Sequence, residues 1–205
     1  MLAVSDRDRI LQAMADCCAE LGYRSTTVEA VLERADVRRE SFDSLFAGKE
    51  DCALAALNKI VSETLARISM IDVDGGPGLE RRTFEVRAIL ELLADRSSFA
   101  KLAAVDSRQA GSARMHGAYE SAARVLALML ERAGAGALGL GERMAARAAL
   151  GGAEALVRRE LVVGGAADLP RLLPDLVYGA LVPFVGQGEA LRQAKLAAKL
   201  AAEEE

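Results

Sequence analysis

The sequence predicts an all-α fold. Apolar residues make up 52% of the chain and aromatic residues only 4%, and most of the apolar residues are alanine and leucine, which favour helices over strands. They recur every three or four positions along most of the chain, which is the period of an amphipathic helix. At 205 residues, the chain is long enough to bury a core without disulfides.

The first two helices are predicted from apolar spacing and from end signals. In Ser5–Leu21 the apolar positions lie four, three and four residues apart, and Gly22 ends the helix. Thr26 and Glu29 then form a capping-box pattern ahead of a second apolar run. This pattern predicts a helix of about two turns that ends near Ala35.

A second short helix and a long helix follow. Asp36 and Val37 break the apolar pattern, and Arg38–Phe46 then carries its large apolar residues on one side. A long helix is predicted for Lys49–Ile71, ending before the glycine- and proline-rich segment 75–78. The remaining helices are predicted at about 79–95, 97–109, 112–133, 140–163, 168–186 and 188–202.

The order of the first three helices matches a helix-turn-helix. In that motif a tight turn joins two short helices, and the second of them enters the major groove of DNA. Arg38–Phe46 is the predicted recognition helix. The long helix after it has apolar positions enough to face both sides, so we place the domain boundary at its start. Residues 1–48 form the predicted DNA-binding domain and residues 49–205 the second domain.

Several residues between positions 27 and 50 follow a specific order. A Thr-Val pair, an alanine and a valine around the turn, two phenylalanines four positions apart and a Lys-Glu pair occur at Thr27, Val28, Ala35, Val37, Phe42, Phe46, Lys49 and Glu50. With this order and spacing, residues 9–57 resemble the DNA-binding region of the TetR family of transcriptional regulators. The resemblance implies an all-α homodimer with an N-terminal three-helix helix-turn-helix domain and a C-terminal helical bundle that binds an effector and dimerises.

The resemblance also implies which side chains meet double-stranded operator DNA. A helix N-terminus favours anions, so Thr27 is expected at a phosphate, with Lys49 also on the DNA backbone. An arginine in the major groove can read guanine through two hydrogen bonds, and Arg39 is our first candidate for that role. The predicted DNA-binding set is Thr27, Arg38, Arg39, Ser41, Asp43, Ser44 and Lys49.

Three residues depart from the family pattern. Asp36 replaces the glycine of the turn, and Asp43 and Leu45 replace the usual aromatic rings. Residues 1–50 contain seven Lys and Arg against ten Asp and Glu, so the positive charge expected of a DNA-binding surface is weak. Either the affinity is modest, or the acids read cytosine amino groups. An alternative function is a TetR-fold protein with weakened or lost DNA binding that acts through protein contacts.

The resemblance implies that the last long helices pair with those of a second copy. Small residues within 141–161 permit close helix approach, and larger residues within 172–184 would supply the second helix face. The predicted dimer-interface set is Ala148, Gly152, Ala155, Leu172, Leu176, Ala180 and Phe184. An intramolecular core is the alternative role for each of them. A dimer would place two recognition helices about 34–36 Å apart, one turn of DNA.

An effector pocket is expected among the helices from 79 to 133, which the family plan uses neither for DNA nor for the dimer. The predicted effector-binding set is Phe84, Arg87, Phe99, Met115, His116, Tyr119 and Met129. A role in the ordinary core, or on the surface for Arg87, is the alternative. Because leucine and alanine are abundant and aromatic residues few, we expect an apolar small-molecule effector.

No enzymatic activity, cofactor or metal is predicted. A GxGxxG sequence at Gly134, Gly136 and Gly139 lacks the preceding strand that a dinucleotide site requires. Histidine occurs once, at His116, which cannot by itself suggest a metal site.

The cysteines and the apolar segments point to a reduced compartment away from the membrane. Cys17, Cys18 and Cys52 have no CxxC spacing, so neither a disulfide framework nor a zinc site is indicated. A redox sensor using the adjacent Cys17 and Cys18 is a rival interpretation, but neighbouring helical residues do not readily form a disulfide, and we expect small buried hydrophobes. No stretch approaches the roughly 20 apolar residues of a membrane span, so we expect a cytoplasmic protein.

Overall fold

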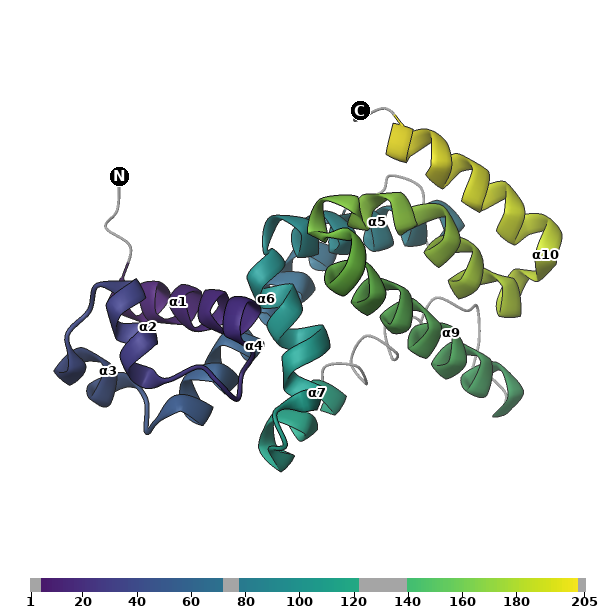
Figure 1. Ribbon diagram of the computed structural model, residues 1–205. Coiled ribbons are helices and arrows are strands. Elements are labelled where there is room, and N and C mark those ends of the chain that lie inside the picture. The colour runs from purple at the N-terminus through teal and green to yellow at the C-terminus, as the bar shows by residue number, and fades with distance from the viewer. Residues whose placement is uncertain (1–4, 72–77, 122–139, 203–205) are drawn as a thin grey trace. The chain divides into compact units, whose positions relative to one another are not determined.

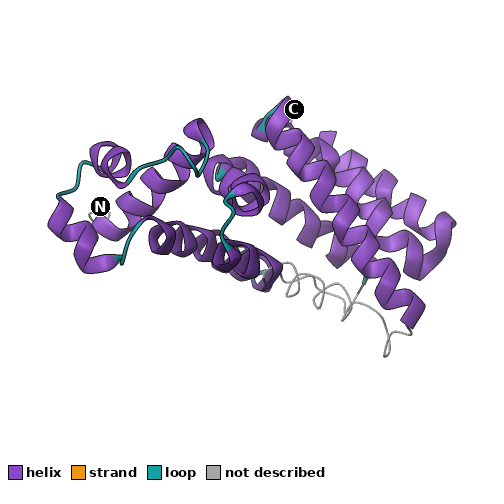
Figure 2. Ribbon diagram, turned by 60° about the horizontal axis from the view of Figure 1, so that its bottom comes forward, coloured by secondary structure: helices purple, strands orange, loops and turns teal. Residues whose placement is uncertain are grey.

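The computed structural model describes residues 5–71, 78–121 and 140–202, and all regular structure within these ranges is helical (Figures 1 and 2). The predicted all-α fold is confirmed. None of the helices in these ranges is both long enough and apolar enough to cross a membrane.

The described helices pack into two units. The N-terminal unit lies within Met1–Glu63 and Arg96–Ser121, and the C-terminal unit lies within Thr64–Asp95 and Ala122–Glu205. This division by packing differs from the predicted boundary between residues 48 and 49. That boundary separates the predicted DNA-binding domain from the second domain, and it stays a prediction.

The N-terminal unit surrounds its first helix. It contains α1 (Asp6–Leu21), α2 (Val28–Ala35), α3 (Arg39–Leu45), most of α4 (Lys49–Ser69), α6 (Ser97–Lys101), the π-helical turn η1 (Leu102–Asp106), α7 (Ser107–Gln109) and a helical segment at residues 113–121. Ile10, Leu11 and Met14 of α1 have no exposed surface, and α2, α3, α6 and η1 all contact α1. Burial of the apolar face of α1 holds the unit together.

The C-terminal unit is also built of packed helices and has its own core. It contains α5 (Leu79–Asp95), α9 (Leu140–Arg159), the π-helical turn η2 (Glu160–Gly164), the 3-10 helix η3 (Ala166–Leu172) and α10 (Leu173–Ala202). In this unit α5 packs on η3 and α10, and α10 packs on α9. Leu90, Leu161, Leu169 and Leu173 are fully buried between them.

The predicted helices of the first third agree with the structure to within two residues, because their end signals act locally. The helix predicted to begin at 168 is wrong at its start, since residues 166–172 form a 3-10 helix and α10 begins at Leu173. Pro170 lies inside this stretch and has no N–H to donate to an α-helical hydrogen bond. Gly186, with φ 75° and ψ 169°, interrupts α10 at the predicted break.

The turn between α2 and α3 is made by an aspartate in the left-handed conformation. Asp36 has φ 51° and ψ 53°, and the N–H groups of Asp36 and Val37 donate to carbonyls of α2 at 3.3 Å each. The guanidinium of Arg9 donates to the carbonyl oxygen of Asp36 at 2.6 Å. A link to α1 therefore holds the turn, although a side chain there costs free energy that glycine avoids.

We expect Asp36→Gly to raise the free energy of unfolding by about 0.5–1 kcal/mol, because glycine adopts positive φ without steric cost. The lost carboxylate contributes little, since it is fully exposed and 3.4 Å from Arg9. Asp36→Ala is the matched control, which keeps the Cβ and should lower the stability. Chemical unfolding of the two variants measures both effects, and a less stable Asp36→Gly protein would contradict this account.

Candidate nucleic-acid interface

Two short helices present their polar faces to solvent on the N-terminal unit. Both α2 and α3 pack on α1 (Figure 1), and they bury Val31, Ala35 and Phe42. The ring of Phe42 lies 5.4 Å from the ring of Phe46, centroid to centroid. With its apolar side fixed in this way, α3 leaves its remaining residues exposed, apart from the half-buried Ser41, as a helix-turn-helix recognition helix would.

The start of α2 is suited to an anion. Thr27 is the N-cap, and its hydroxyl oxygen accepts a hydrogen bond from the Ala30 N–H at 3.2 Å. Thr27 itself is exposed, and the positive end of the helix dipole lies beside it. Thr27 is therefore an exposed N-cap residue, and its predicted phosphate contact stays a prediction.

The predicted residues of α3 share one exposed surface with acidic neighbours. Arg38, Arg39, Asp43 and Ser44 are exposed and Ser41 is half-buried. Ser44 donates a hydrogen bond to the Ser41 carbonyl at 2.8 Å. The Arg39 guanidinium forms ion pairs with Asp43 of its own helix, at 3.1 Å, and with Glu29 of α2, at 3.0 Å.

Lys49, the first residue of α4, supports the segment that precedes α2. Its ammonium group donates to the carbonyl oxygens of Tyr23 at 2.9 Å and Thr26 at 2.8 Å, and lies 4.4 Å from the centroid of the Tyr23 ring. These contacts give Lys49 a structural role that sequence reasoning missed. Its predicted contact with the DNA backbone stays a prediction.

The same segment is held from a second side by a buried carboxylate. The Tyr23 N–H donates to Asp106 of η1 at 2.9 Å, and Asp106 is 8% exposed. Burial raises the pKa of Asp106, and the Tyr23 N–H partly opposes that rise. No local sequence pattern points to this residue, because its partner lies 83 positions away.

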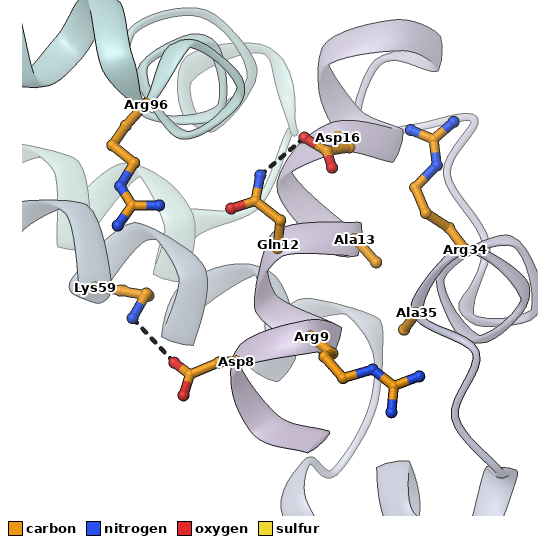
Figure 3. Close-up of a pocket in the computed structure, with 9 residues that line it drawn as sticks. All are labelled: Asp8, Arg9, Gln12, Ala13, Asp16, Arg34, Ala35, Lys59 and Arg96. Atoms are coloured by element: carbon orange, nitrogen blue, oxygen red, sulfur yellow. Dashed lines mark hydrogen bonds and ion pairs between the residues drawn. The ribbon is translucent and has the colours of Figure 1, made fainter. Parts of the chain in front are cut away.

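A polar groove of about 550 Å³ lies beside α1 in this unit (Figure 3). Its lining residues are Asp8, Arg9, Gln12, Ala13, Asp16, Arg34, Ala35, Lys59 and Arg96. Lys59 pairs with Asp8 at 3.0 Å, and Arg34 pairs with Glu20 at 2.6 Å. Because its cations are matched by carboxylates, the groove has no strong attraction for an anion.

The three cysteines are buried in the N-terminal unit. Burial raises the pKa of Cys18 to about 12 and that of Cys52 to about 12, and it also raises the pKa of Cys17. Thiols in this state are protonated at neutral pH and poorly reactive. They pack as small hydrophobes, which argues against the redox-sensor interpretation.

The predicted effector residues fall in both units. Phe84 and Arg87 are half-buried on α5, and Arg87 pairs with Glu91 at 2.6 Å. In the N-terminal unit Phe99 and Met115 are core residues with at most 1% exposure. The predicted pocket stays a prediction.

The other predicted effector residues are more exposed or lie elsewhere. His116 is exposed. Tyr119 is half-buried, and the centroid of its ring lies 5.6 Å from Cζ of the Arg108 guanidinium. Met129 and the GxGxxG sequence lie outside the described residues. In the parts of the chain that are described, no three His, Cys, Asp or Glu side chains cluster as metal ligands would.

The predicted dimer residues are mostly accessible on the C-terminal unit. Ala148, Gly152 and Ala155 are exposed on α9, and Leu172, Ala180 and Phe184 are half-buried. Leu176 is different, since it is only 7% exposed. Its position in the protomer's own core leaves it little surface to offer a second copy.

Comparison with known proteins identifies the fold. Neither protein-family models nor curated protein sequences gave a match. Among solved structures, the fatty acid degradation regulator FadR from Bacillus halodurans superposes with a TM-score of 0.73 and 16% identity, over 91% of this chain and 98% of that chain. TylP, a TetR regulator from Streptomyces fradiae, superposes with a TM-score of 0.70 and 18% identity, over 97% and 96%.

A third structure leads to the same conclusion. A gamma-butyrolactone receptor described as an ArpA-like protein superposes with a TM-score of 0.68 and 21% identity, over 97% of both chains. The chain therefore has the all-α fold of the TetR-type regulators.

We expect Asp106→Asn to stabilise the protein at neutral pH. Because the folded-state pKa is raised above the ordinary value of 3.8, the stability that Asp106 contributes is fully present below pH 3.8 and is lost as pH rises through the folded-state pKa. The amide resembles the protonated acid and still offers Tyr23 an oxygen. Unfolding measured between pH 3.5 and pH 7 should show the variant's advantage growing with pH.

Glu33→Gln is the control for this series, because Glu33 is an exposed acid of the same unit. It should leave the pH dependence of unfolding unchanged. A constant difference between Asp106→Asn and the unmodified protein at every pH would show that the burial of charge at Asp106 has no effect on stability.

Proposed function

We propose that this chain, which has the fold of the TetR-type regulators, is a cytoplasmic transcriptional regulator that binds operator DNA as a homodimer. The observation that carries the proposal is the exposed polar face of α3, which is fixed by α1 and follows a tight turn from α2. This is the arrangement that places a recognition helix in the major groove. The proposed activity is binding, with no chemical step.

Repression that is relieved by a small molecule is the proposed mode of regulation. The FadR protein of Bacillus subtilis has been solved in complex with stearoyl-CoA, and it superposes on this chain with a TM-score of 0.66 and 18% identity, over 87% of this chain and 97% of that chain. A gamma-butyrolactone receptor shares the fold as well. These neighbours support a small-molecule effector here, and we propose an apolar one bound by residues of the predicted effector set.

The proposed dimer uses α9 and α10. Large apolar residues are also exposed in this unit: Met144 of α9 at 64%, and Val162 and Val163 of η2, which follows α9, at 64% and 77%. Apolar surface of this kind on a described helix favours burial against a partner. Two copies paired here would each contribute one recognition helix, so that weak contacts to each half-site would add.

An alternative function is protein recognition by a TetR-type fold with little DNA affinity. The observation that favours it is the placement of Glu29 and Asp43 around Arg39, which offsets positive charge where DNA would lie. Acidic side chains repel phosphates, and the strength of non-specific binding depends on the number of phosphates neutralised.

DNA binding is tested with a library of random double-stranded DNA, followed by a salt series on the selected sequence. We expect salt-sensitive, sequence-specific binding. Arg39→Ala should reduce discrimination at one base pair by about 1–3 kcal/mol, as loss of a base contact does. Arg38→Ala is the matched control, because it removes the same charge from the adjacent exposed residue and should weaken binding evenly across sequences.

Two results would favour the alternative function. One is the absence of any selected sequence at low salt from properly folded protein. The other is binding that follows salt alone and is affected equally by both arginine variants.

The dimer is tested with Gly152→Glu. Gly152 is exposed, and a Cβ built on it meets no atom within 4 Å, so the side chain fits the protomer but prevents close approach of a second α9. We expect sedimentation to show dimers of the unmodified protein and monomers of the variant. Gly117→Glu is the control, because Gly117 is exposed with equally open space and lies outside the proposed interface. A dimeric Gly152→Glu protein would rule out this interface.

A further inference from the structure

The guanidinium of Arg39 is held between carboxylates from both short helices. Its Nε donates to the two oxygens of Asp43 at 3.1 and 3.2 Å, and its Nη1 donates to Glu29 at 3.0 Å. Asp43 lies one turn further along α3, whereas Glu29 belongs to α2. We call these three residues the arginine clamp.

We propose that Asp43 and Glu29 are specificity-determining positioning residues, which hold Arg39 in one orientation for reading a base pair. This inference rests on the proposed function and identifies acidic residues that act through Arg39. It differs from the expectation that Asp43 itself reads a cytosine amino group, because here Asp43 contacts the guanidinium and not the base.

The geometry leaves part of the guanidinium available to DNA. The carboxylates engage Nε and Nη1, whereas Nη2 takes part in neither ion pair. The Arg39 side chain is 54% exposed, so these remaining donors face solvent. A guanidinium has five N–H donors in a rigid plane, and fixing two edges of that plane also fixes the direction of the third.

Fixing the side chain in advance favours base reading in two ways. A free arginine loses rotamer entropy when it binds, and a clamped one has lost much of that freedom already. The two carboxylates also repel phosphates near Arg39. This repulsion weakens non-specific binding more than it weakens a contact between Arg39 and a base. Both effects raise the ratio of specific to non-specific affinity.

Stability alone does not account for these ion pairs. Glu29 and Asp43 are exposed, at 74% and 56% of their side-chain surface, and exposed ion pairs contribute little to folding. Their effect is therefore expected on the orientation of Arg39, which shows in base preference.

The test compares Asp43→Ala with Asp43→Asn on the DNA site selected by the unmodified protein, and on versions of that site with single base-pair changes. Arg39→Ala identifies the base pair that Arg39 reads. Asp43→Ala should lower the preference at that same base pair by about tenfold, within the range of one good base contact. Asp43→Asn keeps an oxygen that accepts from Nε, so it should retain the preference to within about threefold while losing the charge.

Glu40→Ala is the matched control. Glu40 is an exposed acid of α3, and among the described residues it makes no ion pair with Arg39. Its removal should strengthen binding to all sequences without changing any base preference. Circular dichroism and thermal unfolding confirm that each variant is folded.

Three outcomes would overturn the inference. Equal tightening of all sites by both Asp43 variants would show that Asp43 only repels phosphates. Loss of preference at a base pair other than the one read by Arg39 would show that Asp43 contacts a base directly. If the unmodified protein selects no sequence, the proposed function fails as well, whereas the first two outcomes leave it intact.

Discussion

The burial of α1 is the constraint on which the N-terminal unit depends. Ile10, Leu11 and Met14 are wholly enclosed, and the helix carrying them packs against α2 and α3 as well as against α6 and η1. The apolar face of α1 therefore fixes α3 and anchors residues from beyond α5. A cavity in such an enclosed core lowers the free energy of unfolding. The position of α3 therefore depends on the packing of the whole N-terminal unit.

Polar contacts then fix the segment that begins the helix-turn-helix. Lys49 engages two of its carbonyl oxygens, and Asp106 engages one of its N–H groups. These contacts satisfy backbone groups of Tyr23 and Thr26, which lie between α1 and α2. Thr27, the N-cap of α2, therefore follows a well-defined backbone segment.

Local chemistry explains what the sequence could predict. Gly22, the Thr27 cap and the Asp36 turn act within a few residues, so the helices of the first third and the exposed face of α3 followed from pattern alone. The carbonyl contacts of Lys49 and the buried Asp106 join positions 23 or more residues apart, and no periodicity encodes them. For Leu176 the sequence left two roles open, the dimer interface and the protomer's own core, because helical spacing does not reveal which face of α10 meets its own protomer.

The discontinuity of the N-terminal unit has a consequence for exchanging parts between regulators. The chain leaves this unit after Glu63 and returns to it at Arg96, and the returning helix covers one side of α1. A chimera that joins the first 48 residues to a foreign sensor would leave that side of α1 without its native cover. Recombination that preserves folding would have to carry residues 96–121 along with the helix-turn-helix, so the two units of this chain cannot be exchanged by a single crossover.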